Sequence, residues 1–173
     1  MRIGLVSDTH GRFDPRLPEL LAGCERILHA GDVMGAAVIE KLAAIAPTAA
    51  VRGNNDRDAF GATLPEVLVE SVGELSVLVI HELGKPEKLL PAARQAIEQA
   101  APQLVIYGHS HKPAIEVRDG RLYVNPGSCG PRRFSLPRSI AILDLRRNRA
   151  RVELLDLEGS GRQSLLEPAE VAF

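Results

Sequence analysis

Short apolar runs recur along the chain and alternate with helical patterns over its first two thirds, which is typical of an α/β domain. The single runs predict strands over residues 3–7, 26–30, 48–51, 103–108, 139–145 and 151–157. Two longer runs predict hairpins, at residues 65–82 with a turn at 72–74 and at residues 114–125 with a turn at 119–120. The last two thirds of the chain are therefore rich in strands.

Three segments have the pattern of helices. Residues 14–21 predict a helix with Asp14 as its N-cap and Pro15 at its first helical position. Residues 36–46 contain strong helix formers and are closed by Pro47. Residues 86–100 predict a third helix, with Pro91 as an alternative start. The tail over residues 158–173 shows no clear periodicity.

The number of predicted elements limits the architecture. About ten strands and three helices are more than one open sheet comfortably holds, whereas two sheets packed face to face can hold them. We therefore predict an α/β fold, a four-layer α/β/β/α sandwich of two mixed sheets flanked by helices. At 173 residues the chain fits a single domain, 1–173, which can bury enough surface to fold without disulfides.

Composition excludes several classes of partner. With 21 basic and 22 acidic residues, the chain has no overall charge that would favour nucleic acid or an acidic membrane. Cys24 and Cys129 lie far apart outside any CxxC pattern, so we interpret them as ordinary thiols in a reducing compartment. No run of about 18 apolar residues and no signal peptide is recognisable. These features predict a soluble cytoplasmic protein.

Hard polar side chains gather where the predicted strands end. They occur in five loops, in the order Asp8 and His10, Asp32, Asn54, His81, and then His109 and His111. All five histidines of the chain occupy such positions. Ligand sites in α/β sheets form at the carboxyl ends of strands, so these loops can meet at one edge. If the segments are extended, residues two apart point the same way, and each D-x-H or H-x-H pair forms half a chelate.

Each motif alone has a simpler explanation. Asp32 could cap the following helix, and the GNND stretch at residues 53–56 could be only a turn. The ordered set of five motifs is much harder to attribute to chance, and it predicts a metal site. His29 lies in or just after the buried second strand, and we interpret it as a core or supporting residue rather than a ligand.

The blocks SDTHG, AGDV, GNND, IHE and YGHSH resemble the calcineurin-like metallophosphoesterases, whose pattern is D-x-H, GD, GNHD, a lone H and GHxH. The resemblance covers Met1 to about Ser128, and the short chain is similar to the small single-domain phosphodiesterase branch. It implies two metal ions, one held by Asp8, His10 and His111, the other by Asn54, His81 and His109, with Asp32 bridging both. Oxygen and imidazole ligands without thiolate favour Mn²⁺, with Ni²⁺, Fe²⁺, Co²⁺ or catalytic Zn²⁺ as alternatives.

The resemblance also implies a reaction, in which a hydroxide shared by the ions attacks a small-molecule phosphodiester. A neutral amide at Asn54 helps to leave the centre cationic, which suits a phosphate oxygen. The family's third GNHD residue is a histidine near the leaving group, but here it is Asn55, which cannot surrender a proton near neutral pH. Asn55 and Asp56 are the candidate catalytic residues of this motif. Their pattern favours phosphodiesters with good leaving groups over phosphomonoesters.

The turn over residues 125–130 (NPGSCG) lies near the metal centre in the family. It makes Asn125 and the following Arg132 candidate substrate contacts, although a tight turn with a solvated basic pair explains them equally well. Small relatives commonly self-associate, so a homo-oligomer is also a candidate state. The rival hypothesis is a protein-interaction scaffold similar to the retromer small subunit. A nuclease is a weaker alternative, because the chain has neither an additional domain nor a basic excess.

Overall fold

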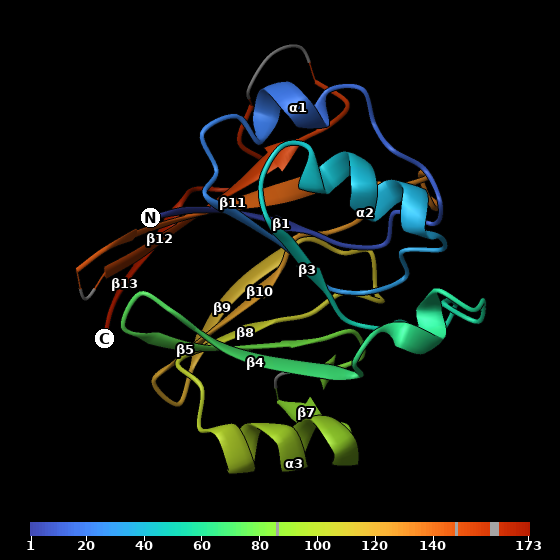
Figure 1. Cartoon of the computed structure of the whole chain (residues 1–173). Helices are drawn as coiled ribbons and strands as arrows, with labels where there is room; N and C mark the ends of the chain where they lie inside the picture. The colour runs from blue at the N-terminus through green and yellow to red at the C-terminus, as the bar shows by residue number, and fades with distance from the viewer. Residues whose placement is uncertain (86, 148, 160–162) are drawn as a thin grey trace.

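The structure is a computed structural model that describes residues 1–85, 87–147, 149–159 and 163–173. Two mixed sheets lie face to face with helices on both outer sides, which confirms the predicted four-layer sandwich (Figure 1). The helices α1 (Leu17–Leu20) and α2 (Ala36–Ala43) cover the first sheet, and α3 (Pro91–Ala100) covers the second.

The first sheet has six strands in the order β13-β12-β11-β1-β2-β3. Its strands are β1 (Arg2–Val6), β2 (Arg26–His29), β3 (Thr48–Ala50), β11 (Ser139–Arg146), β12 (Arg149–Asp156) and β13 (Ala169–Ala172). β1, β2 and β3 are parallel, whereas β11 pairs with β1 in the antiparallel sense. The carboxyl ends of the three parallel strands therefore share one edge.

The second sheet has five strands in the order β4-β5-β8-β10-β9. Its strands are β4 (Val67–Val72), β5 (Leu75–Ile80), β8 (Leu104–Ile106), β9 (Ala114–Arg118) and β10 (Arg121–Asn125). The antiparallel pairs β4–β5 and β9–β10 are the two predicted hairpins. β5, β8 and β10 are parallel, so two further loops at strand ends face the same edge.

Apolar side chains fill all three spaces between the layers. Strand alternation sends Ile3 and Leu5 of β1 into the cluster between the sheets and Val6 into the cluster beneath α1 and α2. A third cluster joins Ile97 of α3 to the second sheet. β1 is thus buried on both faces, as expected for a strand within a covered sheet, and the loop after it is firmly anchored.

Two predicted helix boundaries were wrong. α1 begins at Leu17 rather than at residue 15, and Asp14 does not cap it. The Asp14 carboxylate instead accepts a hydrogen bond from the Arg16 backbone (2.9 Å) and pairs with Arg138 (2.5 Å). Long-range pairing with Arg138, the residue before β11, thus replaces the local cap. α2 ends at Ala43, three residues before the predicted end.

The segment before α3 and the C-terminal tail also differ from the prediction. α3 starts at Pro91, the alternative start, and a small hairpin of β6 (Gly84–Lys85) and β7 (Lys88–Leu89) precedes it. Pro86, the first predicted start, lies outside the described residues. β13 is an unpredicted strand, and its four residues are too few to show a periodicity. None of the described helices is long and apolar enough to span a membrane.

Candidate metal centre

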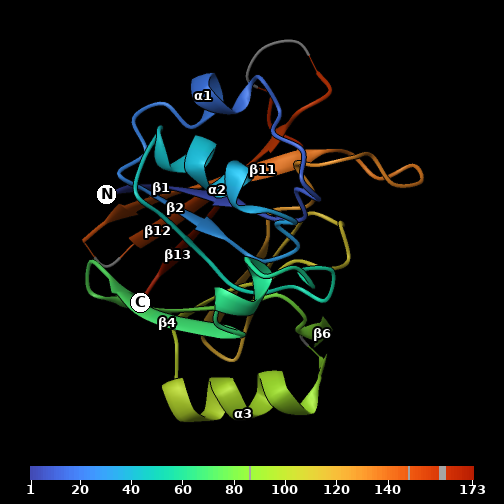
Figure 2. The same ribbon diagram turned by 45° about the vertical axis from the view of Figure 1, so that its right-hand side comes forward.

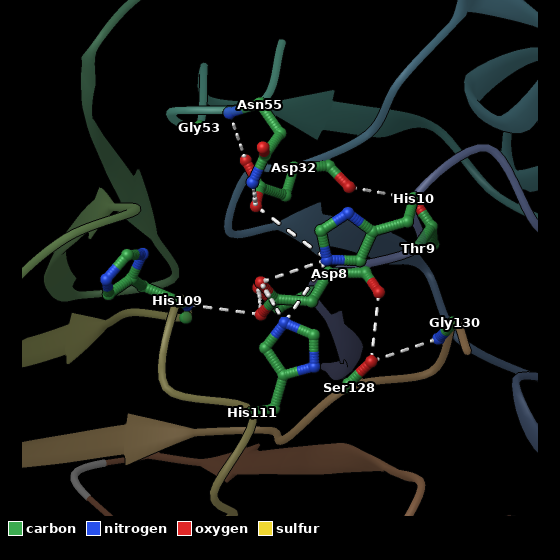
Figure 3. A network of polar contacts seen from close by, with 12 residues as sticks. Asp8, Thr9, His10, Asp32, Gly53, Asn55, His109, His111, Ser128 and Gly130 are labelled. Atoms are coloured by element: carbon green, nitrogen blue, oxygen red, sulfur yellow. Dashed lines mark hydrogen bonds and ion pairs between the residues drawn. The ribbon is translucent and has the colours of Figure 1, made fainter. Parts of the chain in front are cut away.

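Five loops bring the seven predicted ligands to one edge of the sandwich. Figure 3 shows Asp8, His10, Asp32, His109 and His111 among them. The loops after β1, β2 and β3 come from the first sheet, and those after β5 and β8 come from the second. In chain order they carry Asp8 and His10, Asp32, Asn54, His81, and His109 with His111. The centre therefore bridges the two sheets and depends on their packing.

Asp8, His10 and His111 offer three ligand atoms that all lie within 4.8 Å of one another. Asp8 Oδ1 is 3.2 Å from His111 Nε2 and 3.9 Å from His10 Nε2, and the two Nε2 atoms are 3.2 Å apart. Asp8 Oδ1 is buried and has no hydrogen-bond partner. An unpartnered buried carboxylate oxygen facing two imidazole nitrogens fits a cation site.

Asp32 faces two groups of predicted ligands. Its Oδ2 lies 3.8 Å from His10 Nε2, and its Oδ1 lies 3.5 Å from His81 Nε2. Asn54 Oδ1 is 3.1 Å from both His81 Nε2 and His109 Nδ1. Asp8, Asp32 and His81 form a second set of ligand atoms within 4.8 Å of one another. This placement suits a carboxylate shared by two ions.

The tautomer of His81 gives a separate test of whether a cation fits. His81 Nδ1 lies 2.7 Å from the carbonyl oxygen of Ala30, which can only accept, so Nδ1 carries the proton in the neutral ring. Nε2 then presents a lone pair toward the oxygens of Asn54 and Asp32. Although burial lowers the pKa of His81, the carboxylates of Asp32 and Asp8 raise it overall, so this position attracts positive charge, and oxygen with imidazole suits a divalent metal there.

Both carboxylates are held in the ionised form. Burial raises the pKa of Asp8, but the neighbouring His111 and His81 and the hydrogen bond from the Ser7 hydroxyl together outweigh burial, and the pKa falls below its ordinary value. Burial likewise raises the pKa of Asp32, but the neighbouring His81 and the two hydrogen bonds from Asn55 outweigh burial and hold the pKa well below its ordinary value. Deprotonated carboxylates are the form that binds metal.

The backbone that carries the ligands is not extended, so the predicted reason for the pairing of neighbouring ligands was wrong. Five of the seven ligands have a positive φ, namely Asp8 (54°), His10 (47°), Asp32 (56°), His109 (68°) and His111 (58°). Such left-handed conformations cost about 1 to 3 kcal/mol each for residues other than glycine. Hydrogen bonds from the Asp8 and His10 amides to the loop after β2, of 3.0 and 2.9 Å, hold the first two in place.

Two glycines allow the loops to approach the carboxylates. A Cβ at Gly53 would overlap Oδ1 and the backbone nitrogen of Asp32, and a Cβ at Gly108 would overlap the Ser7 hydroxyl and crowd Asp8. Neither position has room for a side chain, because the carboxylates themselves occupy the space. The glycines of the GNND and GHSH motifs therefore have a packing role beside the ligands.

Asn55 makes a contact that the sequence did not indicate. Its side-chain amide donates to Asp32 Oδ2 at 2.6 Å, and its backbone N–H donates to Asp32 Oδ1 at 2.8 Å. The two donors hold the Asp32 carboxylate in a fixed orientation between His10 and His81. Asn55 is therefore a positioning residue for a predicted metal ligand, and it lies where the family has its histidine.

Asp56 and Asn125 form hydrogen bonds with the loops around the site. Asp56, a candidate catalytic residue, accepts hydrogen bonds from the backbone amides of Met34 (2.6 Å) and Gly53 (2.8 Å) through its two oxygens. Asn125, a candidate substrate contact, is fully buried and donates to the Gly108 carbonyl at 3.0 Å. The polar groups of both residues are thus engaged with the loops, and their roles toward a substrate stay predictions.

The two arginines after the glycine-rich turn, Arg132 and Arg133, have different surroundings in the structure. Arg132 lies near Glu158, with an Nη1–Oε1 distance of 3.6 Å, and its contact with a substrate stays a prediction. Its neighbour Arg133 reaches the centre, where Nη2 lies 3.4 Å from His10 Nε2. The loop that carries both residues leads into β11 and extends away from the sheets (Figure 2). Arg133 is thus the arginine beside the predicted ligands.

His29 supports the loops from within the core, as the sequence indicated. Its Nδ1 accepts a hydrogen bond from the Gly31 amide (3.1 Å), so the proton lies on Nε2, which donates to Thr9 Oγ1 (3.0 Å). Burial is the main cause that lowers the pKa of His29 to about 4. The neutral ring therefore joins the loops after β1 and β2.

This lowered pKa predicts a loss of stability in acid. The unfolded chain takes up a proton at His29 below about pH 6.5, whereas the folded chain resists until about pH 4, so stability falls over that window. The full difference corresponds to about 3 kcal/mol. The variant His29→Gln keeps a hydrogen-bond donor in its amide but has no titrating group at this position. Its free energy of unfolding, measured with urea, should therefore fall less than that of the wild type between pH 6.5 and pH 4. Equal pH dependence of the two metal-free proteins would contradict this expectation.

Comparison with known families identifies the chain. The model of the calcineurin-like phosphoesterase superfamily domain matches residues 1–148. The chain belongs to the calcineurin-like phosphoesterase superfamily. This phosphoesterase is 30% identical over 171 residues to the probable metallophosphoesterase YsnB of Bacillus subtilis (strain 168), with 95% of this chain and 96% of that protein covered.

One further relative and one solved structure are similar to this calcineurin-like phosphoesterase over most of its length. It is 28% identical over 173 residues to the phosphodiesterase MJ0936 of Methanocaldococcus jannaschii, with 90% of this chain and 100% of that protein covered. The structure of vacuolar protein sorting 29 from Cryptosporidium parvum has the same fold, with a TM-score of 0.82, 21% identity, and coverage of 99% and 98%. The family and the fold predicted from the motifs are therefore confirmed.

Proposed function

We propose that this calcineurin-like phosphoesterase is a divalent-metal-dependent phosphodiesterase. The observation that carries the proposal is the convergence of imidazole nitrogens and carboxylate oxygens around Asp8 Oδ1, which is buried and lacks a hydrogen-bond partner. Imidazole nitrogens that face an unpartnered, buried carboxylate oxygen are suited to binding a divalent metal. The relatives named as metallophosphoesterase and phosphodiesterase support the same reaction class.

The side chains would divide between two ions, for which Mn²⁺ is the favoured choice. Two bound divalent ions would lower the pKa of a water molecule and polarise the phosphate. In our proposal one ion is held by Asp8, His10 and His111, the other by Asn54, His81 and His109, with Asp32 facing both. Asn55 fixes the orientation of the Asp32 carboxylate through two hydrogen bonds.

Two features of this chain would determine which phosphate esters react. The guanidinium of Arg133, beside His10, can donate hydrogen bonds to a phosphate oxygen at the centre. Position 55 carries an amide that cannot release a proton, so a departing alkoxide receives no help from this residue. Hydrolysis should therefore favour diesters with good leaving groups.

Hydrolysis of bis(4-nitrophenyl) phosphate and 4-nitrophenyl phosphate tests the proposal. Protein stripped with a chelator and then loaded with Mn²⁺ should cleave the diester faster than the monoester, and the stripped protein should cleave neither. The control is the same protein incubated with Ca²⁺, an ion that prefers larger all-oxygen sites. A clear preference for the monoester, or no cleavage of either compound with any transition metal, would contradict the proposal.

The second candidate function is a protein-interaction scaffold, which the likeness in fold to vacuolar protein sorting 29 favours. The residues at the seven ligand positions can all bind metal, which supports the enzyme instead. Metal analysis of the purified protein separates the two candidates. A protein that retains no divalent metal and shows no activity with added ions would support the scaffold.

A further inference from the structure

A groove opens directly beside the candidate metal centre. Its first part is a hollow of about 300 Å³, which Asn54 and His81 line together with the aliphatic Val67, Ile80, Leu90 and Ala92 and the charged Arg52, Glu66 and Glu82. A second hollow of about 490 Å³ continues along β4 and α3 and shares Val67 and Ala92 with the first. We call the two hollows together the β4–α3 groove, and two predicted metal ligands line its first part.

The walls of the β4–α3 groove are aliphatic. Leu90 and Val69 are large apolar residues that remain 37% and 48% exposed, although most such side chains in the chain are buried. The helical side adds alanines and glutamines but no charge. Among the described residues that line the groove there is no Phe, Tyr or Trp. The groove therefore offers aliphatic contact but no ring on which a nucleobase could stack.

The charges at the mouth of the groove do not favour a second anionic group. Arg52, the arginine of the lining, is paired with Glu66. Glu82 adds a partly exposed carboxylate between the groove and His109, with Oε1 at 3.6 Å from His109 Nε2. A ligand with a further phosphate would meet negative charge here. A neutral apolar group meets no such penalty and covers exposed Leu90 and Val69.

We propose that the β4–α3 groove binds an aliphatic ester group of the substrate, so that the enzyme prefers alkyl phosphodiesters of the kind found in lipid-derived compounds. The inference rests on the proposed function, because the phosphate must lie at the metal centre for its ester group to enter the groove. We assign an aliphatic ester group to the groove because Asn54 and His81, two predicted metal ligands, line the same hollow as its aliphatic side chains.

A series of alkyl 4-nitrophenyl phosphates tests this preference with Mn²⁺-loaded protein. The methyl, butyl and hexyl esters share one leaving group, so kcat/KM reports the contact made by the alkyl chain. Each buried methylene contributes up to about a fourfold gain, so the butyl ester should exceed the methyl ester by about 10- to 60-fold. A series with no dependence on chain length overturns the inference.

Two variants locate the effect in the groove. Ala92→Asp places a charge on the wall at the start of α3, where an acidic residue is favourable for the helix. Leu90→Ser removes an apolar contact and supplies a good N-cap at the residue that precedes the helix. In both, the ratio of butyl to methyl ester activity should fall at least fivefold. Ala22→Asp is the matched control on the opposite outer layer and should keep the wild-type ratio.

Binding measurements separate failure of this inference from failure of the proposed function. Calorimetry with dimethyl and dibutyl phosphate reports the groove without requiring turnover. If no ester is cleaved but dibutyl phosphate binds more tightly, and Ala92→Asp removes the difference, the groove inference holds and the catalytic proposal fails. If chain length affects neither binding nor turnover, the groove inference fails. A stable dimer that Ala92→Asp converts to a monomer would also overturn it, because a second copy would then occupy the groove.

Discussion

Replacing Asp8 by asparagine is expected to lower diester hydrolysis by about 10³-fold and to remove most of the bound metal. Asp8 belongs to both groups of clustered ligand residues, and its buried Oδ1 has no hydrogen-bond partner. The substitution keeps the shape of the side chain but removes its charge and one ligand oxygen. Metal catalysis contributes several kcal/mol, which corresponds to this loss in rate. Steady-state kinetics and the metal content of the purified variant measure the two effects.

Thermal unfolding shows whether the loss arises from metal binding or from misfolding. Metal at a thousandfold excess over its dissociation constant adds about 4 kcal/mol to the free energy of unfolding. Asp8→Asn should lose this increment. Its metal-free stability should persist, since an amide oxygen can still accept from Ser7 Oγ and the His109 amide. Asp119→Asn, the same change in an exposed hairpin turn, is the control. Full metal content in Asp8→Asn would contradict the assignment.

The sequence predicts the layers of this fold because strand alternation and helix propensity are local properties. The sequence patterns that predict β1 and the two hairpins each depend on residues close together in the chain, and the structure contains all three elements. The start of α1 depends on a distant partner, because Asp14 pairs with Arg138 across 124 residues and is no longer free to cap the helix. β13 forms by pairing with β12, and its four residues are too few to predict this pairing from the sequence.

The difference between local and long-range interactions also decides how much of the candidate site the sequence predicts. The order of the motifs indicates which loops converge, because parallel strands present their ends at one edge. It does not indicate which of two adjacent arginines turns inward, and the structure selects Arg133 rather than Arg132. The partners of Asn55 and Asp56 also depend on the left-handed turns of the neighbouring loops. These contacts are tertiary, so a motif can locate a residue without showing its role.

Replacing Asn55 by histidine is expected to raise hydrolysis of diesters with poor leaving groups, such as dialkyl phosphates, by about 10²-fold. An imidazole at this position can donate a proton to a departing alkoxide, and general acid catalysis is typically worth about 10² to 10⁴ in rate. The nitrophenyl diester should change little, because nitrophenolate leaves without a proton. Rates measured over a series of leaving groups should therefore depend less steeply on leaving-group pKa in the variant.

The contact between Asn55 and Asp32 makes this substitution a test of positioning as well. The backbone N–H of residue 55 still donates to Asp32 Oδ1, but the side-chain bond to Oδ2 is lost unless the new ring replaces it. Asn55→Gln is the control, because it retains an amide and supplies no proton. If both variants lose activity on every substrate together with metal content, orientation of Asp32 is the main role of this side chain. A gain confined to poor leaving groups in Asn55→His would show that position 55 also faces the departing oxygen.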